Sequence, residues 1–95
     1  MDPSPSEDLL DAHHTFPGPY TIKAIGSTEG GFPARVVAAA VRELGVAEGN
    51  LESSVRATSG GRHVAVTLNL TVQSAEQVRA IYANIRELDG LTLLL

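Results

Sequence analysis

The side chains that could do chemistry in this 95-residue chain include two adjacent histidines, His13 and His14, near its start. Neighbouring residues in an extended chain point in opposite directions, and no third ligand lies nearby in the sequence. The chain has no cysteine, which excludes disulfides, thiolate metal sites and cysteine nucleophiles. We therefore predict no metal site and interpret the two histidines as solvated.

A second group of polar residues surrounds the stretch "TSGGRH", residues 58–63. Two consecutive glycines suit a β-hairpin turn, which needs positive φ angles. The basic residues beside the turn could form a patch that docks an acidic partner, and the alternative is a solvated hairpin tip. The candidate contact residues of this group are Lys23, Arg56, Ser59, Gly61, Arg62 and His63.

The stretch "GSTEGG", residues 26–31, lies between an expected strand and an expected helix, where backbone amides favour anions. It lacks the lysine of a phosphate-binding loop, does not match the dinucleotide fingerprint, and contains Glu29, which repels anions. It is either a plain connection or part of a small-molecule site. Its candidate contact residues are Gly26, Ser27, Gly30 and Gly31.

Acid–base or nucleophilic catalysis is not supported by the remaining polar residues. The face that we expect to stay open carries side chains that do not titrate near neutrality: Thr21, Thr67, Asn69, Thr71 and Thr92. The proton carriers expected there are His63 and Lys23, and the pattern places no acidic partner beside them. We predict that the protein is not an enzyme, with no catalytic residue and no cofactor.

The charge balance limits the classes of partner. A net charge of −4 and a pI near 5.2 argue against nucleic acid, which requires a basic footprint. RNA-recognition domains stack bases on aromatic residues of their central strands, and none is expected on this face. No apolar run approaches the roughly 20 residues that cross a bilayer, and the N-terminus does not resemble a signal peptide. We expect no membrane association and a cytoplasmic location.

The composition divides the chain into two parts. Residues 1–15 contain two prolines and four acidic residues, a composition that favours a disordered tail. Residues 16–95 form one domain, which begins with the extended stretch Phe16-Pro17-Gly18-Pro19.

Hydrophobic periodicity predicts the elements of this domain. Strands are expected at 20–25, 51–58, 63–72 and 91–95. Helices are expected from Phe32-Pro33 to Gly45 and from Ser74, whose spacing to Gln77 matches a capping box, to Asp89-Gly90. The strand at 63–72 is the strongest element, with aliphatic residues at every second position: Val64, Val66, Leu68, Leu70 and Val72.

The resulting order is βαββαβ, which predicts an α+β ferredoxin-like sandwich. Two helices cover one face of a four-stranded antiparallel sheet, the first and third strands are central, and the other face is bare. The uncharged final strand is an edge, and such edges invite pairing with another chain. A homodimer through this edge strand is therefore one hypothesis, to which Leu94 would add apolar area.

An ordered set of residues resembles the small bacterial YbeD-like proteins over about residues 16–95. The set is Phe16-Pro17-x-Pro19-Tyr20-Thr21-x-Lys23-x-x-Gly26, then Ser59-x-Gly61, Glu76-Gln77-Val78, Tyr82 and Asp89. The resemblance implies a fold similar to the ACT regulatory domain and a family without an established activity. His63 departs from the pattern, because relatives often carry an aromatic residue, typically tyrosine, at that position.

Two functional hypotheses follow. The first is a non-enzymatic regulatory or protein-interaction module that uses an unknown protein partner. The second is a sensor of an amino acid or another metabolite, held near residues 26–31 at a subunit interface. This second hypothesis rests on analogy with ACT domains, in which the corresponding region often contributes to an amino-acid pocket.

Overall fold

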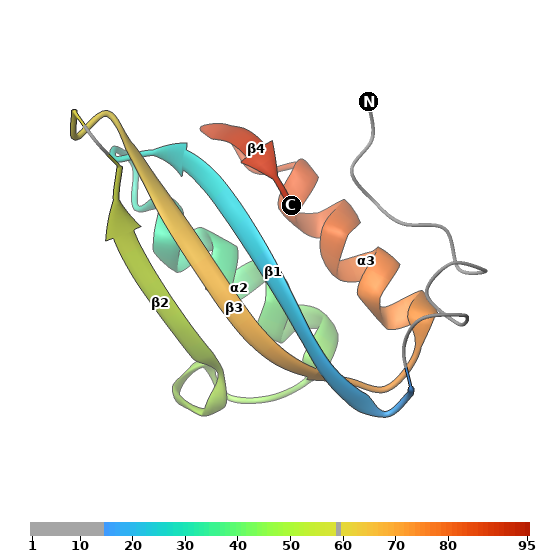
Figure 1. Cartoon of the computed structure of the whole chain (residues 1–95). Helices are drawn as coiled ribbons and strands as arrows, with labels where there is room; N and C mark the ends of the chain where they lie inside the picture. The colour runs from blue at the N-terminus through green and yellow to red at the C-terminus, as the bar shows by residue number, and fades with distance from the viewer. Residues whose placement is uncertain (1–14, 59) are drawn as a thin grey trace.

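Four strands and two long helices make up the part of the chain that the computed structural model describes, residues 15–58 and 60–95 (Figure 1). In chain order the elements are β1 (Gly18–Ser27), α2 (Phe32–Leu44), a 3-10 turn η1 (Glu48–Asn50), β2 (Glu52–Ala57), β3 (His63–Val72), α3 (Ala75–Arg86) and β4 (Leu91–Leu94). This order confirms the predicted βαββαβ arrangement. Residues 1–14 of the expected tail, residues 1–15, lie outside the described residues together with the histidine pair.

The sheet has the strand order β2-β3-β1-β4, and every neighbouring pair is antiparallel. The first and third strands are central, as predicted. The buried residues of both helices join those of the strands in one core, so both helices pack on the same side of the sheet. Figure 1 shows α2 behind β3 and β1 and α3 beside β1, and no described element crosses in front of the sheet. We call this uncovered side the open face.

The core confirms the alternation that the sequence predicted for β3. All five aliphatic residues of that strand are at most 9 % exposed. They pack against one stripe of each helix, because their common face is the one turned to the helices. The other large or central members of the core are Ile22, Ala24, Phe32, Val36, Ala40, Val78, Ile81, Tyr82 and Ile85.

The ends of α2 follow from its glycines and its proline. Gly31 precedes the helix with φ 66°, a left-handed conformation that glycine adopts without a steric penalty, and Pro33 occupies the first turn. Gly45 ends the helix with φ 69°, and its N–H donates to the carbonyl of Val41 at 2.8 Å.

The start of α3 is capped by Ser74, whose hydroxyl accepts a hydrogen bond from the Gln77 N–H at 3.1 Å. In a capping box the third residue returns a bond to the amide of the cap itself. Here the Gln77 side chain instead accepts from the N–H of Gln73, one residue earlier, at 2.8 Å. The helix start predicted from this spacing is confirmed, with a shifted reciprocal bond.

Strand β4 differs from the expectation in two respects. Leu94 is only 3 % exposed and belongs to the core, so the prediction that it adds apolar area to an edge contact is wrong. A register shift pairs Leu91 with Gly26 and Leu93 with Ile25, so Leu93 occupies the open-face position expected for Thr92. Among the described residues, neither helix combines the length and apolar character needed to span a bilayer.

Candidate functional site

The open face is built from every second residue of the strands, as the register shows. Positions opposite one another share a face, so Thr21, Asn69 and Glu52 form one row and Lys23, Thr67 and Ser54 form the next. A third row contains Ile25, Ala65 and Arg56, and Leu93 continues it on β4.

The first row is held by side-chain hydrogen bonds that cross three strands. The Thr21 hydroxyl donates to Asn69 Oδ1 at 3.0 Å, and Asn69 Nδ2 donates to Glu52 Oε1 at 3.2 Å. The sequence pattern placed no acidic side chain beside Lys23 and His63. Glu52 does lie on the open face, where its carboxylate contacts the side-chain amide of Asn69. These bonds orient polar groups at a surface.

An apolar patch occupies the β1–β4 side of the open face. Leu93 and Leu95 are 47 % and 56 % exposed, and the half-buried Ile25 lies opposite Leu93. Backbone hydrogen bonds in both directions, at 2.8 and 3.1 Å, place Leu95 opposite Lys23. We define the apolar patch as Ile25, Leu93 and Leu95. It was not predicted, because sequence alternation alone does not say which face of a short edge strand is covered.

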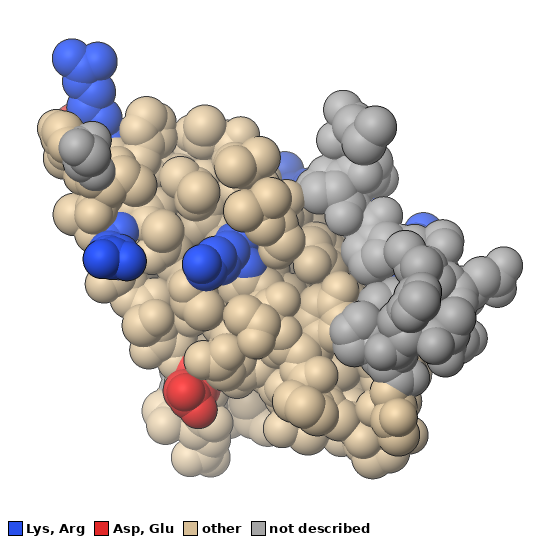
Figure 2. Space-filling view, viewed as in Figure 1, with Lys and Arg blue, Asp and Glu red and all other residues tan. Residues whose placement is uncertain are grey.

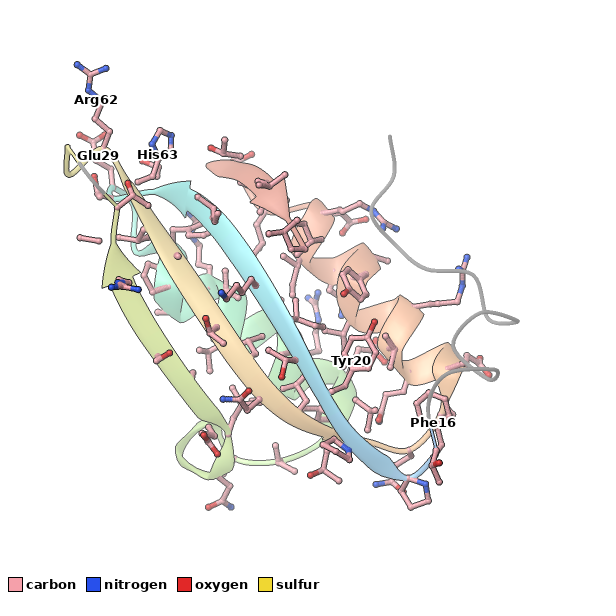
Figure 3. The ribbon with its side chains drawn as sticks, viewed as in Figure 1. Phe16, Tyr20, Glu29, Arg62 and His63 are labelled. Carbon is pink, nitrogen blue, oxygen red and sulfur yellow. The ribbon has the colours of Figure 1, made fainter. Side chains whose placement is uncertain are left out.

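Basic groups dominate the charge on this side. Lys23 and Arg56 lie on the open face, and Figure 2 shows a largely uncharged surface on which basic groups are more prominent than acidic ones. Arg62 projects from the hairpin tip, and His63 follows it at the same end of the sheet (Figure 3). The predicted basic residues are therefore spread over the open face and the tip of the hairpin.

The hairpin between β2 and β3 confirms the turn geometry expected from its glycines. Gly60 and Gly61 have φ angles of 90° and 69°. The Thr58 N–H donates to the His63 carbonyl at 2.9 Å, and the Thr58 hydroxyl donates to the same oxygen at 3.1 Å. Ser59 lies outside the described residues. The turn itself explains both glycines, so neither requires a ligand.

The stretch from Gly26 to Gly31 packs closely against the turn before β4. A Cβ on the buried Gly26 would lie 2.6 Å from the carbonyl oxygen of Gly90 and equally close to the Phe32 ring. The Ser27 N–H donates to that same carbonyl at 2.9 Å. Gly26 is therefore required by packing, whereas Gly30 and Gly31 adopt positive φ angles of 73° and 66° at the helix start.

Arg35 braces this connection, and sequence reasoning did not identify it. Its Nε donates to the Gly30 carbonyl at 3.0 Å, and a terminal nitrogen donates to the Asp89 carbonyl at 2.9 Å. The guanidinium carbon also lies 5.8 Å from the centre of the Phe32 ring, a cation–π distance. No spacing rule links residues 35 and 89, so only the fold could reveal this contact.

The two predicted contact regions meet at one end of the sheet. Ser27 at the end of β1 lies opposite His63 at the start of β3. The candidate contact residues of the 26–31 connection and of the hairpin therefore share this end, whereas Lys23 and Arg56 lie farther along the open face. Glu29 is drawn at the same end in Figure 3.

The described residues contain no cluster of three His, Cys, Asp or Glu side chains that could hold a metal ion. At the opposite end of the sheet lies a pocket of about 430 Å³, whose walls include Leu44, Val46, Leu51, Glu52, Leu70 and Gln77. Glu52 is its one titratable lining residue among those described. This lining does not provide the acid–base pair that catalysis needs.

The tyrosine pair behind the sheet is structural. Tyr20 and Tyr82 meet edge to face with ring centres 6.3 Å apart. Burial, followed by hydrogen bonding and charge interaction with Tyr20, raises the pKa of Tyr82 well above its ordinary value. The Tyr82 phenol is therefore neutral near physiological pH and acts as a core residue with a satisfied hydroxyl.

Comparison with known proteins identifies relatives over nearly the whole chain. Residues 11–95 match a family described as a protein of unknown function, DUF493. UPF0250 proteins of Shewanella piezotolerans and Shewanella frigidimarina are 35 % and 33 % identical over 75 residues, covering 79 % of this chain and 82 % of each relative. A UPF0250 protein of Vibrio vulnificus is 29 % identical over 89 residues, 94 % of this chain and 89 % of the relative. The resemblance to YbeD-like proteins is thus confirmed: the chain belongs to the DUF493/UPF0250 family, whose function is unknown.

Proposed function

We propose that this domain is a non-enzymatic protein-interaction module that docks its partner on the open face. The observation that carries this proposal is the apolar patch of Ile25, Leu93 and Leu95 on a sheet face that no described element covers. Exposed aliphatic side chains that lie side by side mark interaction sites more often than scattered ones do.

The charges around the patch favour an acidic partner segment. Four of the eleven acidic residues of the chain lie in residues 1–14, so residues 15–95 carry seven basic and seven acidic residues. Within this neutral domain the open face carries Lys23 and Arg56 against Glu52. A protein segment with apolar side chains flanked by carboxylates would complement both the patch and Lys23 beside it.

Affinity capture with charge variants tests this proposal. The purified protein is immobilised through its N-terminus and, in a parallel experiment, through its C-terminus. It is then exposed to a cell extract of the organism that produces it. Leu93→Asp and Lys23→Glu are expected to reduce recovery of the specific partner by about tenfold or more, because hot-spot truncations commonly cost over 1 kcal/mol. The captured protein is then purified and its Kd measured by titration.

Val46→Asp is the matched control, because Val46 is 44 % exposed and lies in the segment after α2. It introduces the same charge at a similarly exposed aliphatic residue. Equal loss of binding in Val46→Asp and Leu93→Asp would contradict docking at the patch. Amide NMR shifts confined to the helix side on partner addition would contradict it independently.

A second candidate function is the binding of a small carboxylate on α2, which modifies the metabolite-sensor hypothesis, because that hypothesis placed the ligand near residues 26–31 at a subunit interface. A pocket of about 270 Å³ beside the Arg35 brace is lined by Arg35, Ala38, Ala39, Arg42 and Leu88. Arg35 joins it to the predicted 26–31 region through Gly30. The Arg35 guanidinium already donates to the Gly30 and Asp89 carbonyls, so Arg42 is the residue that would pair with a carboxylate beside these small apolar side chains.

Thermal-shift screening distinguishes this candidate from protein docking. A carboxylate at about 100 times its Kd should stabilise the fold by roughly 2.7 kcal/mol. Arg42→Gln should abolish the shift, whereas Arg62→Gln, at the hairpin tip, should retain it. A panel of amino acids and carboxylate metabolites that leaves the melting temperature unchanged counts against the sensor and leaves the docking proposal intact.

A further inference from the structure

We propose that β2 pairs with β2 of a second copy of this chain, which joins two sheets edge to edge. The side chains of all six β2 residues are exposed, including Val55 at 54 %, although alternate residues face the helix side. β2 is an outer strand of the sheet, and Figure 1 shows no described element beyond it. A free strand edge of this kind is a template for another strand.

The hydrogen bonding of the hairpin shows which backbone groups of β2 point away from the sheet. Thr58 lies opposite His63, and its N–H bonds to the His63 carbonyl. In an antiparallel pair bonded positions alternate, so Ser54 and Arg56 point their backbone groups at β3. Ser53 and Val55 consequently point theirs away from the sheet.

The sequence of β2 is complementary to itself in one antiparallel register. When Ser54 lies opposite its own symmetry mate, Ser53 lies opposite the second copy's Val55, and both present outward N–H and C=O groups. Glu52 then lies opposite Arg56 of the second copy, on the open face, and twofold symmetry creates this ion pair twice. These positions form the non-hydrogen-bonded pairs, in which opposed side chains approach most closely.

Other registers that retain the backbone bonds lose this complementarity. The next such register in either direction places Ser53 opposite Ser53, or Val55 opposite Val55, of the second copy. In both registers Glu52 no longer lies opposite Arg56. A further shift places Arg56 opposite Arg56 or Glu52 opposite Glu52, which is destabilising. The spacing of the two charges therefore selects one register, and the occupant that matches it is a second copy of this chain.

The structure favours this edge over the one predicted from the sequence. β4 has four residues, a register shift against β1 and its Leu94 in the core, whereas β2 has six residues in uninterrupted register with β3. Six residues extend for only about 20 Å. The interface is therefore small, and we expect a weak dimer with a Kd on the order of 10⁻⁴ M.

Charge exchange between two variants tests the register directly. Glu52→Arg alone places like charges opposite each other in the dimer, and Arg56→Glu alone does the same with the opposite sign. Each variant should weaken self-association by roughly tenfold or more, measured by sedimentation velocity from about 10 µM to about 1 mM. An equimolar mixture of the two should restore association, because every pair is then attractive between unlike chains.

Proline substitutions separate edge pairing from a fold defect. Ser53→Pro removes an outward N–H that the intramolecular ladder does not use, so the variant should remain folded by circular dichroism and become monomeric. Thr92→Pro on β4 is the edge control and should leave association unchanged. A monomer at every concentration, or association that the charge variants leave unaltered, would overturn the proposal.

Discussion

Replacing Gly26 with alanine tests how tightly the end of β1 is packed. The added Cβ would lie 2.6 Å from the Gly90 carbonyl oxygen and 2.5 Å from the nearest Phe32 ring carbon. Gly26 has no positive φ, so the expected effect comes from packing alone. Because Phe32 is fully buried and Gly90 O is bonded to the Ser27 amide at 2.9 Å, neither can move without losing other contacts.

The expected cost follows from these contacts. Overpacking a well-packed site typically costs about 1–3 kcal/mol, and the fixed carbonyl places this site in the upper part of that range. A smaller gain of about 0.4–1 kcal/mol comes from the reduced entropy of the unfolded chain. We therefore expect a net loss of about 1–2.5 kcal/mol, which for a domain of this size lowers the melting temperature by roughly 5–20 °C.

Urea unfolding monitored by far-UV circular dichroism measures this loss, since the chain has no tryptophan to report by fluorescence. Gly49→Ala is the matched control, because a Cβ there meets nothing within 4 Å and Gly49 also lacks a positive φ. Its free energy of unfolding should change by less than about 1 kcal/mol in either direction.

A double variant identifies the neighbour responsible. Phe32→Leu removes the ring edge that the new methyl group would meet but leaves the Gly90 carbonyl in place. The combined variant should therefore be more stable than the sum of the two single losses by about 1 kcal/mol. If Gly26→Ala unfolds at the same urea concentration as the parent, or no more easily than Gly49→Ala, the close-packing argument is refuted.

Three further predictions concern the cap of α3, the buried Tyr82 and the Arg35 brace. Ser74→Ala should lower the free energy of unfolding by about 0.5–2 kcal/mol in urea, because the Gln77 amide loses its acceptor; an unchanged midpoint would contradict this. Because the folded-state pKa of Tyr82 is raised, its contribution to the free energy of unfolding is complete below pH about 10 and declines above it by up to about 1.4 kcal/mol per pH unit. Tyr82→Phe should flatten this decline in alkaline solution, and an equal slope in the variant would contradict the prediction. Arg35→Gln should cost about 1 kcal/mol and accelerate hydrogen exchange of the Ser27 amide, whereas unaltered exchange would show that the brace is unimportant.

Much of the fold could be predicted because periodicity reports burial directly. The aliphatic residues of β3 alternate without a break, and a slip by one residue would expose all of them. The helix boundaries at Gly45 and Ser74 followed from local chemistry that does not depend on the rest of the molecule. The strand order then followed from the element order.

The details that escaped prediction depend on long-range contacts. Arg35 reaches the Asp89 carbonyl across 54 positions of sequence, and no local pattern encodes that bond. Leu94 could not be assigned to a face before the register shift opposite Gly26 was known. The apolar patch depends on the same shift, since it places Leu93 rather than Thr92 opposite Ile25.

The candidate site was predicted in part. Placement of Lys23 on the open face followed from the alternation of β1, and Gly61 was correctly assigned to a turn. The contact role of these residues stays a prediction. Gly26 was considered for ligand contact on the basis of its residue type, but a Cβ there would overlap the Phe32 ring, which the sequence alone does not indicate.

The core of this protein is complete without β2. None of the buried apolar residues belongs to that strand, so the interior places no demand on the size or shape of its side chains. Substitutions between Glu52 and Ala57 should therefore alter what the molecule recognises while leaving its melting behaviour nearly untouched. For protein engineering, the side chains of β2 can be changed to bind new partners without redesigning the hydrophobic interior.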